Sequence, residues 1–181
     1  LLRKHHAGLS ALSACLSGEI PRRLCAGDYS GAVEAARQMA DIFGPEHFCI
    51  EIQNHRLPEE KQILPQLVRL ARELELPLVA TNDCHYLRRE DAGMQEILTC
   101  IATNRTLQDG GRVGFATDEF YYKTTAEMQA LFSAFPEALE NTVKIAARCS
   151  VELDFSHTYL PRFPCPDGQS AGEYLRSLTY A

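Results

Sequence analysis

A carboxylate and an imidazole follow a short apolar run in the middle of the chain. The run is Leu78–Thr81, and Asp83 and His85 come directly after it. Residues i and i+2 of an extended segment point the same way, so both side chains are expected at the carboxyl end of a buried strand. Such donors suit one divalent metal ion. The D-x-H pattern is common by chance, so Asp83 as a turn cap and His85 packed beside Tyr86 stay open.

Cys15 occupies the corresponding place after another predicted strand, Leu9–Ser13. A lone cysteine is more often a small buried apolar residue than a ligand. Its thiolate would nonetheless add a third donor to Asp83 and His85, and thiolate, imidazole and carboxylate together suit zinc. His55 also follows a predicted strand, and a surface or supporting role is expected for it rather than ligation.

Other polar groups carry weaker signals. Glu119 is predicted to lie with Tyr121 and Tyr122 in an edge strand with aromatic packing, and Arg88 and Arg89 are predicted to be a solvated pair. The sequence contains no P-loop, no G-x-S-x-G and no dinucleotide-binding fingerprint.

Alternating strands and helices must position these groups. Apolar residues at helical spacing predict one helix that begins after Asp28 and ends at Gly44-Pro45, and a second over Ile63–Leu74 with an irregularity at Pro65. Strands are predicted at 9–13, 48–52 and 78–81. This order is typical of parallel βαβ units, whose functional groups lie at the carboxyl ends of the strands.

The pattern changes after residue 89. The later features are a helix over Met94–Ile101, a loop at Gly110-Gly111 and Gly114, a strand over Glu119–Lys123, a helix capped by Thr124-x-x-Glu127, a helix from Pro136, an extended linker around Pro161, Pro164 and Pro166, and a helix opened by Ser170-x-x-Glu173. The first and last residues both read as parts of helices, so a fragment of a longer chain is expected.

Composition excludes several classes of protein. The chain has 181 residues, 45% of them hydrophobic, which argues against a disordered tail. Its 18 basic and 24 acidic residues give a net charge of −6, which does not favour a surface that grips DNA. Seven cysteines without a C-x-x-C pair indicate reduced thiols in a cytoplasmic protein. No apolar run is long enough to span a membrane.

Several segments, in order, resemble one family. Ser13–Glu19, S-A-C-L-S-G-E, is similar to the S-G-C-L-x-G-E segment of the PHP (polymerase and histidinol phosphatase) domain of bacterial DNA polymerase III alpha subunits. Leu76–Leu87 resembles that family's L-P-x-V-A-T-N-D-x-H-Y segment. Three further segments match, namely Thr117–Lys123, Pro136–Thr142 and Leu160–Pro164. The first of these is rich in tyrosine and resembles the replicative type of the family.

The resemblance implies an α/β fold, part of a distorted (β/α)7 PHP barrel with parallel strands, followed by α-rich segments and an extended linker. Family metal ligands include a Cys after one strand and a D-x-H pair after a later one, which correspond to Cys15, Asp83 and His85. The family's remaining ligands, an H-x-H, a further His and a Glu, precede the matched segments. Ala14 replaces the usual Gly and Asn54 an Asp, and neither change removes a ligand.

The resemblance also implies a division of the chain. Residues 1–155 would be the C-terminal portion of a PHP domain, 156–168 a Pro-rich linker and 169–181 the start of the polymerase region. The full protein would carry out template-directed DNA synthesis, with magnesium at a polymerase site elsewhere. The PHP portion would contribute to a metal-dependent phosphoesterase or proofreading exonuclease site that holds zinc, manganese or magnesium. Implied partners are DNA, the sliding clamp, the clamp loader and a proofreading exonuclease, without a membrane.

Two other functions stay open. Some family members have a degraded cluster, and their PHP domain is a scaffold that supports the polymerase or docks a separate exonuclease. A stand-alone phosphatase, such as a histidinol phosphatase, is a third possibility, against which the T-D-E-F-Y and L-P-R-F-P segments argue. Retention of Cys15, Asp83 and His85 favours an intact cluster over a scaffold. Half a barrel leaves strand edges open, so poor stability of the isolated chain is expected.

Overall fold

A computed structural model describes residues 1–108, 114–161 and 163–180. The chain divides into two compact units, Leu1–Cys149 and Ser150–Ala181. The first unit contains a parallel sheet in the order β1 (Ala11–Leu12), β2 (Phe48–Ile52) and β3 (Leu78–Ala80). The predicted α/β class with parallel strands is confirmed. The described residues form three strands, and the seven-stranded barrel remains a proposal.

The register brings the carboxyl ends of the three strands to one edge of the sheet. Ala11 pairs with Phe48, and Ile50 pairs with Leu78. Because all three strands run in the same direction, the residues that follow them lie side by side. This edge therefore collects the polar residues that the sequence places after each strand.

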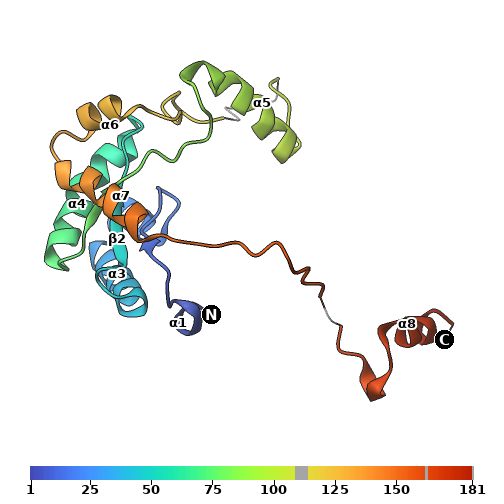
Figure 1. The fold of residues 1–181 in the computed structure, drawn as a ribbon. Coiled ribbons are helices and arrows are strands. Elements are labelled where there is room, and N and C mark those ends of the chain that lie inside the picture. The colour runs from blue at the N-terminus through green and yellow to red at the C-terminus, as the bar shows by residue number, and fades with distance from the viewer. Residues whose placement is uncertain (109–113, 162, 181) are drawn as a thin grey trace. The chain divides into compact units, whose positions relative to one another are not determined.

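Helices α3 (Tyr29–Phe43) and α4 (Pro58–Glu73) pack beside β2 (Figure 1). The predicted cap of α3 is confirmed, since Asp28 Oδ1 accepts a hydrogen bond from Gly31 N at 2.8 Å. Helix α4 begins earlier than predicted and continues through Pro65. Helix α2 (Glu19–Cys25) was not predicted, because seven residues are too few to show a helical period.

The core lies between β2 and these helices. Phe48, Ile50 and Ile52 have no exposed surface and belong to one cluster with residues of α3 and α4. Alternate residues of a strand share a face, so this face of β2 is the apolar one. Burial of each such side chain stabilises the fold by about 1.5–3 kcal/mol. The intervening Cys49 and Glu51 lie on the opposite face.

The later helices follow the predicted order. Thr124 and Glu127 form the predicted capping box, and Pro136 occupies the first turn of its helix. Asn141 of that helix donates to the carbonyl of Leu78 at 2.7 Å, which ties the helix to β3. The remaining elements are α1 (Leu2–His5), η1 (Arg89–Asp91), α5 (Ala92–Thr103), α6 (Thr125–Leu131), α7 (Pro136–Arg148), η2 (Pro166–Gly168) and α8 (Ala171–Tyr180).

Two sequence predictions in this region have different outcomes. The edge strand predicted over Glu119–Lys123 is wrong, because the described residues there form a single bridge, between Tyr86 and Tyr121. The loop predicted at Gly110-Gly111 lies outside the described residues. Among the helices of the described ranges, none is both long and apolar enough to cross a membrane.

Candidate functional site

Glu51 joins the carboxyl ends of the three strands. Its side chain is buried, with the residue 8% exposed. Its Oε2 accepts a hydrogen bond from Ala14 N at 3.1 Å, and its Oε1 accepts one from Gln53 Nε2 at 2.9 Å and another from the Thr81 hydroxyl. Its own N–H donates to Ser13 Oγ at 2.8 Å. A buried carboxylate is costly unless hydrogen-bonded, so these donors hold Glu51 in place and fix the strand ends together.

The turn that carries Cys15 is under backbone strain. Ala14 has a φ of 67°, in the left-handed region that favours glycine. Gly18 closes the same turn, and a Cβ there would lie 2.4 Å from Ser13 O, so only glycine fits. Cys15 is half-buried and lines a small cavity with Glu51.

Relief of this strain is expected to stabilise the chain. An alanine in the left-handed region costs about 1–2 kcal/mol, and the larger unfolded-state entropy of glycine offsets about 0.5–1 kcal/mol of that. Ala14→Gly should therefore raise the free energy of unfolding by about 0.5–1 kcal/mol in urea denaturation. The matched control is Ala26→Gly, at an ordinary φ of −80°, which should destabilise instead. A loss of stability in both variants would contradict the strain.

His55 is fully buried and supports the strand ends. Its Nε2 lies 2.9 Å from the Asn82 carbonyl oxygen and its Nδ1 lies 2.5 Å from Glu60 Oε1. A carbonyl only accepts, so Nε2 carries a hydrogen. The ring stacks on Phe120 with centroids 3.9 Å apart. Both nitrogens are therefore engaged, which leaves neither for a metal and fits the predicted supporting role.

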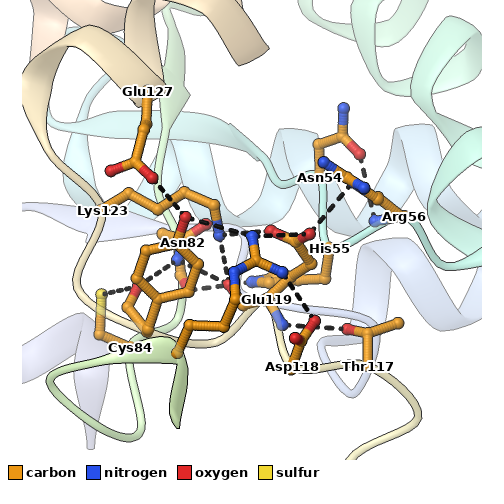
Figure 2. A network of polar contacts seen from close by, with 12 residues as sticks. Asn54, His55, Arg56, Asn82, Cys84, Thr117, Asp118, Glu119, Lys123 and Glu127 are labelled. Carbon is orange, nitrogen blue, oxygen red and sulfur yellow. Dashed lines mark hydrogen bonds and ion pairs between the residues drawn. The ribbon is translucent and has the colours of Figure 1, made fainter.

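A strap, defined as Thr117–Lys123, lies along the segment that follows β3 (Figure 2). Asn82, which is 6% exposed, donates through Nδ2 to the carbonyls of Glu119 and Tyr121 at 3.0 and 2.7 Å. These bonds hold the strap against the strand end. Two backbone bonds add to them: His85 N to Phe120 O at 2.8 Å and Tyr122 N to Tyr86 O at 3.1 Å.

The Glu119 carboxylate of the strap forms ion pairs with three cationic side chains. Its side chain is 4% exposed and lies 3.1 Å from Lys123 Nζ, Arg89 Nη2 and Arg56 Nε (Figure 2). Burial alone would favour the neutral acid, but the hydrogen bonds and charges of Lys123 and Arg89 outweigh it and hold the pKa of Glu119 below its usual range. The cluster thus links the loop after β2, the segment after β3 and the strap.

These contacts correct two expectations. Glu119 does not lie in an edge strand with aromatic packing, because its carboxylate is the centre of an ion cluster. Arg89 is not simply solvated, since it also pairs with Asp118 at 2.9 Å. The ring of Tyr121 lies beneath the Arg89 guanidinium, at 4.8 Å. Of the three cations around Glu119, Lys123 is buried at 4% exposed, whereas Arg89 and Arg56 are 42% and 72% exposed, and no local sequence pattern reports this cluster.

Tyr121 extends the cluster to α6. Its hydroxyl donates to Glu127 Oε1 at 2.5 Å and accepts from Arg89 Nη2 at 3.3 Å. The bond from Tyr121, with those from Thr124, lowers the pKa of Glu127 to about 2. The start of α6 is thereby tied to the strap.

Asp83 and His85 lie in the segment between β3 and the bridge residue Tyr86. Asp83 has a left-handed φ of 41°. His85 is exposed, and its Nδ1 lies 2.6 Å from the Asp83 carbonyl oxygen. Because that oxygen only accepts, Nδ1 carries the hydrogen, and Nε2 of the neutral ring is left as the acceptor. The ring packs against Phe115 and Phe120, at 4.4 and 5.7 Å between centroids.

This geometry does not supply the set of metal ligands that the sequence predicts. Over residues 1–108, 114–161 and 163–180, no group of three or more His, Cys, Asp and Glu side chains is arranged to hold an ion. Cys15 lines the cavity beside Glu51, and His85 packs on Phe120 of the strap. The residues present do not by themselves fit a metal centre, and the assignment of Cys15, Asp83 and His85 as ligands stays a prediction.

A family model described as the PHP domain matches residues 1–55. DNA polymerase III subunit alpha of Treponema pallidum is 43% identical over 99% of this chain, and that of Thermus aquaticus is also 43% identical over 99% of it. The chain is homologous to DNA polymerase III alpha subunits. It covers only 16% and 15% of the length of those two relatives.

The same alpha subunit of Pseudomonas aeruginosa is 41% identical over 96% of this chain, which covers 15% of that relative. The match therefore extends over the strap and the later helices as well as the PHP segment. Sequence reasoning found the segments that carry this homology, but it overlooked Glu51 and Asn82. A signal for Glu51 was present, because one acidic residue interrupts the apolar strand F-C-I-E-I.

Proposed function

We propose that this chain is the C-terminal portion of the PHP domain of a DNA polymerase III alpha subunit. The observation that carries the proposal is 43% identity to such subunits over 99% of the chain. The complete protein would carry out template-directed DNA synthesis in chromosomal replication, with magnesium at a polymerase site outside these residues. Its partners would be DNA, the sliding clamp, the clamp loader and a proofreading exonuclease, in the cytoplasm.

The proposed division of the chain is 1–155 for the PHP portion, 156–168 for the linker and 169–181 for the start of the polymerase region. The end of the first compact unit at Cys149 supports the first limit. In this proposal the complete protein would contact DNA through parts outside these residues. The net charge of −6 accordingly gives this portion no electrostatic grip of its own.

Within the complete protein, Cys15, Asp83 and His85 would supply ligands to a metal site that residues outside this chain complete. A divalent metal there would activate water and offset phosphate charge in phosphodiester hydrolysis. The free Nε2 of His85 supports this role, because Nδ1 is held by the Asp83 carbonyl. The Asp83 side chain would contribute negative charge, and the packing of His85 on Phe115 would orient its ring.

The rival function is a non-catalytic scaffold. One observation favours it: polar groups at the strand ends bond to one another, through Glu51, His55 and Glu119. In that case the strap would stabilise the sheet edge for the rest of the polymerase. Asp83 would then only cap a turn.

Asp83→Asn in the complete protein separates the two functions. The change keeps the side chain's size and removes its charge, so metal content and terminal-nucleotide excision should each fall at least about tenfold, with polymerisation and the thermal midpoint kept. Asp41→Asn, at an exposed position of α3, is the matched control. Joint loss of stability and polymerisation, with no excision by the wild type, would support the scaffold. Unchanged metal content and excision would contradict the ligand role.

A further inference from the structure

Helix α5 exposes an apolar stripe. Met94, Ile97, Leu98 and Ile101 are 63%, 41%, 52% and 72% exposed. Their spacing of i, i+3, i+4 and i+7 places them on one face of the helix. Large apolar side chains scattered singly on a surface are ordinary, but a continuous stripe of four is typical of an interaction surface.

The opposite face of α5 is less exposed although it is more polar. Gln95, Glu96 and Thr99 are half-buried, and Cys100 is the buried residue of the helix. Thr99 Oγ1 donates back to the Gln95 carbonyl at 2.9 Å. A helix that packed only on this unit would turn its apolar face inward. The orientation of α5 therefore indicates that its apolar face is used elsewhere.

Two more exposed leucines flank the helix in the sequence. Leu87 before α5 and Leu107 after it are 75% and 59% exposed. The sequence of α5, A-G-M-Q-E-I-L-T-C-I-A-T, contains no lysine or arginine. Binding to nucleic acid or to an anionic membrane requires such cations. Exposed arginines flank the helix at Arg88 and Arg105, but the stripe itself carries no cation and thus fits an apolar protein partner.

We propose that this stripe docks an apolar helix face from a part of the polypeptide outside these 181 residues. The inference rests on the proposed function, in which the chain lies within a longer subunit. In the alpha-subunit relatives the homologous segment makes up 15–16% of the chain, so most of the polypeptide is available to cover it. A stripe with i, i+3, i+4 and i+7 spacing is the surface that packs against another helix at 8–10 Å between axes.

Hydrogen exchange on the complete protein tests the docking. In the wild type the amides of α5 should be protected, and Ile101→Glu should speed their exchange about tenfold or more, since a charge cannot enter a packed apolar interface. Thr103→Glu is the matched control, because Thr103 is exposed on the same helix on the side away from the stripe and should change exchange little. The wild-type measurement does not depend on the folding of either variant.

Other outcomes would overturn the proposal in distinguishable ways. Rapid exchange of α5 in a wild-type protein that still polymerises would contradict the docking and leave the proposed function in place. Absence of template-directed polymerisation would instead contradict the proposed function. A wild-type dimer that Ile101→Glu converts to monomer in sedimentation would show that a second copy covers the stripe, which also overturns the proposal.

Discussion

Replacing Glu119 by leucine is expected to lower the free energy of unfolding by about 3–5 kcal/mol, because it leaves the buried cation of Lys123 without its carboxylate partner. Lys123 is 4% exposed and lies 3.1 Å from Glu119, so it cannot regain solvent without movement of the strap. Arg56 and Arg89 also lose their shared acceptor and repel each other. Chemical denaturation, followed by circular dichroism, measures the effect.

Two further variants locate the cause. Glu119→Leu with Lys123→Met removes both buried charges and should recover part of the lost stability. A buried ion pair can often be replaced by apolar side chains of similar volume at little cost in free energy. Glu34→Leu, at an exposed position of α3, should change the free energy of unfolding by no more than about 0.5 kcal/mol. If Glu119→Leu were no more harmful than Glu34→Leu, the ion cluster would not stabilise the strap.

Acid is expected to destabilise the first unit by protonating the carboxylates of Glu119 and Glu127. The pKa of Glu119 is lowered in the folded chain, and that of Glu127 is lowered to about 2, whereas an unfolded glutamate has a pKa of about 4.3. A carboxylate whose pKa is lower in the folded chain than in the unfolded chain stabilises the fold at pH values above its unfolded pKa. This contribution is lost as the pH falls through the folded pKa. The free energy of unfolding should therefore be nearly constant above about pH 5 and fall between about pH 4.5 and pH 2.

Denaturation at a series of pH values and constant ionic strength measures this decline. Glu119→Gln is uncharged at every pH, so its profile should be shallower over the same interval. Glu34→Gln provides the control, because an exposed glutamate on α3 should leave the slope unchanged. A rise in stability on acidification, or identical slopes in all three proteins, would contradict the role of Glu119.

Local chemistry made some elements predictable. The strand predicted at 48–52 has the same bounds in the structure, Phe48–Ile52, because β-branched and aromatic residues in a short run between helices favour a strand. The helix after Asp28 and the box of Thr124 and Glu127 are also recovered, since a cap depends on side chains within three residues of one another. Their alternation was enough to indicate parallel strands.

The sequence by itself thus determined the order of elements, the edge at which polar residues gather and the segments shared with DNA polymerase III alpha subunits. Only the tertiary structure decided that Glu119 is buried and that Arg56, Arg89 and Lys123 converge on it. Arg56 lies 63 positions from Glu119 in the numbering, and no periodicity relates positions so distant. A buried charge is costly unless it is paired, and these partners meet only where the strap lies against the sheet edge, so their pairing is a property of the folded chain.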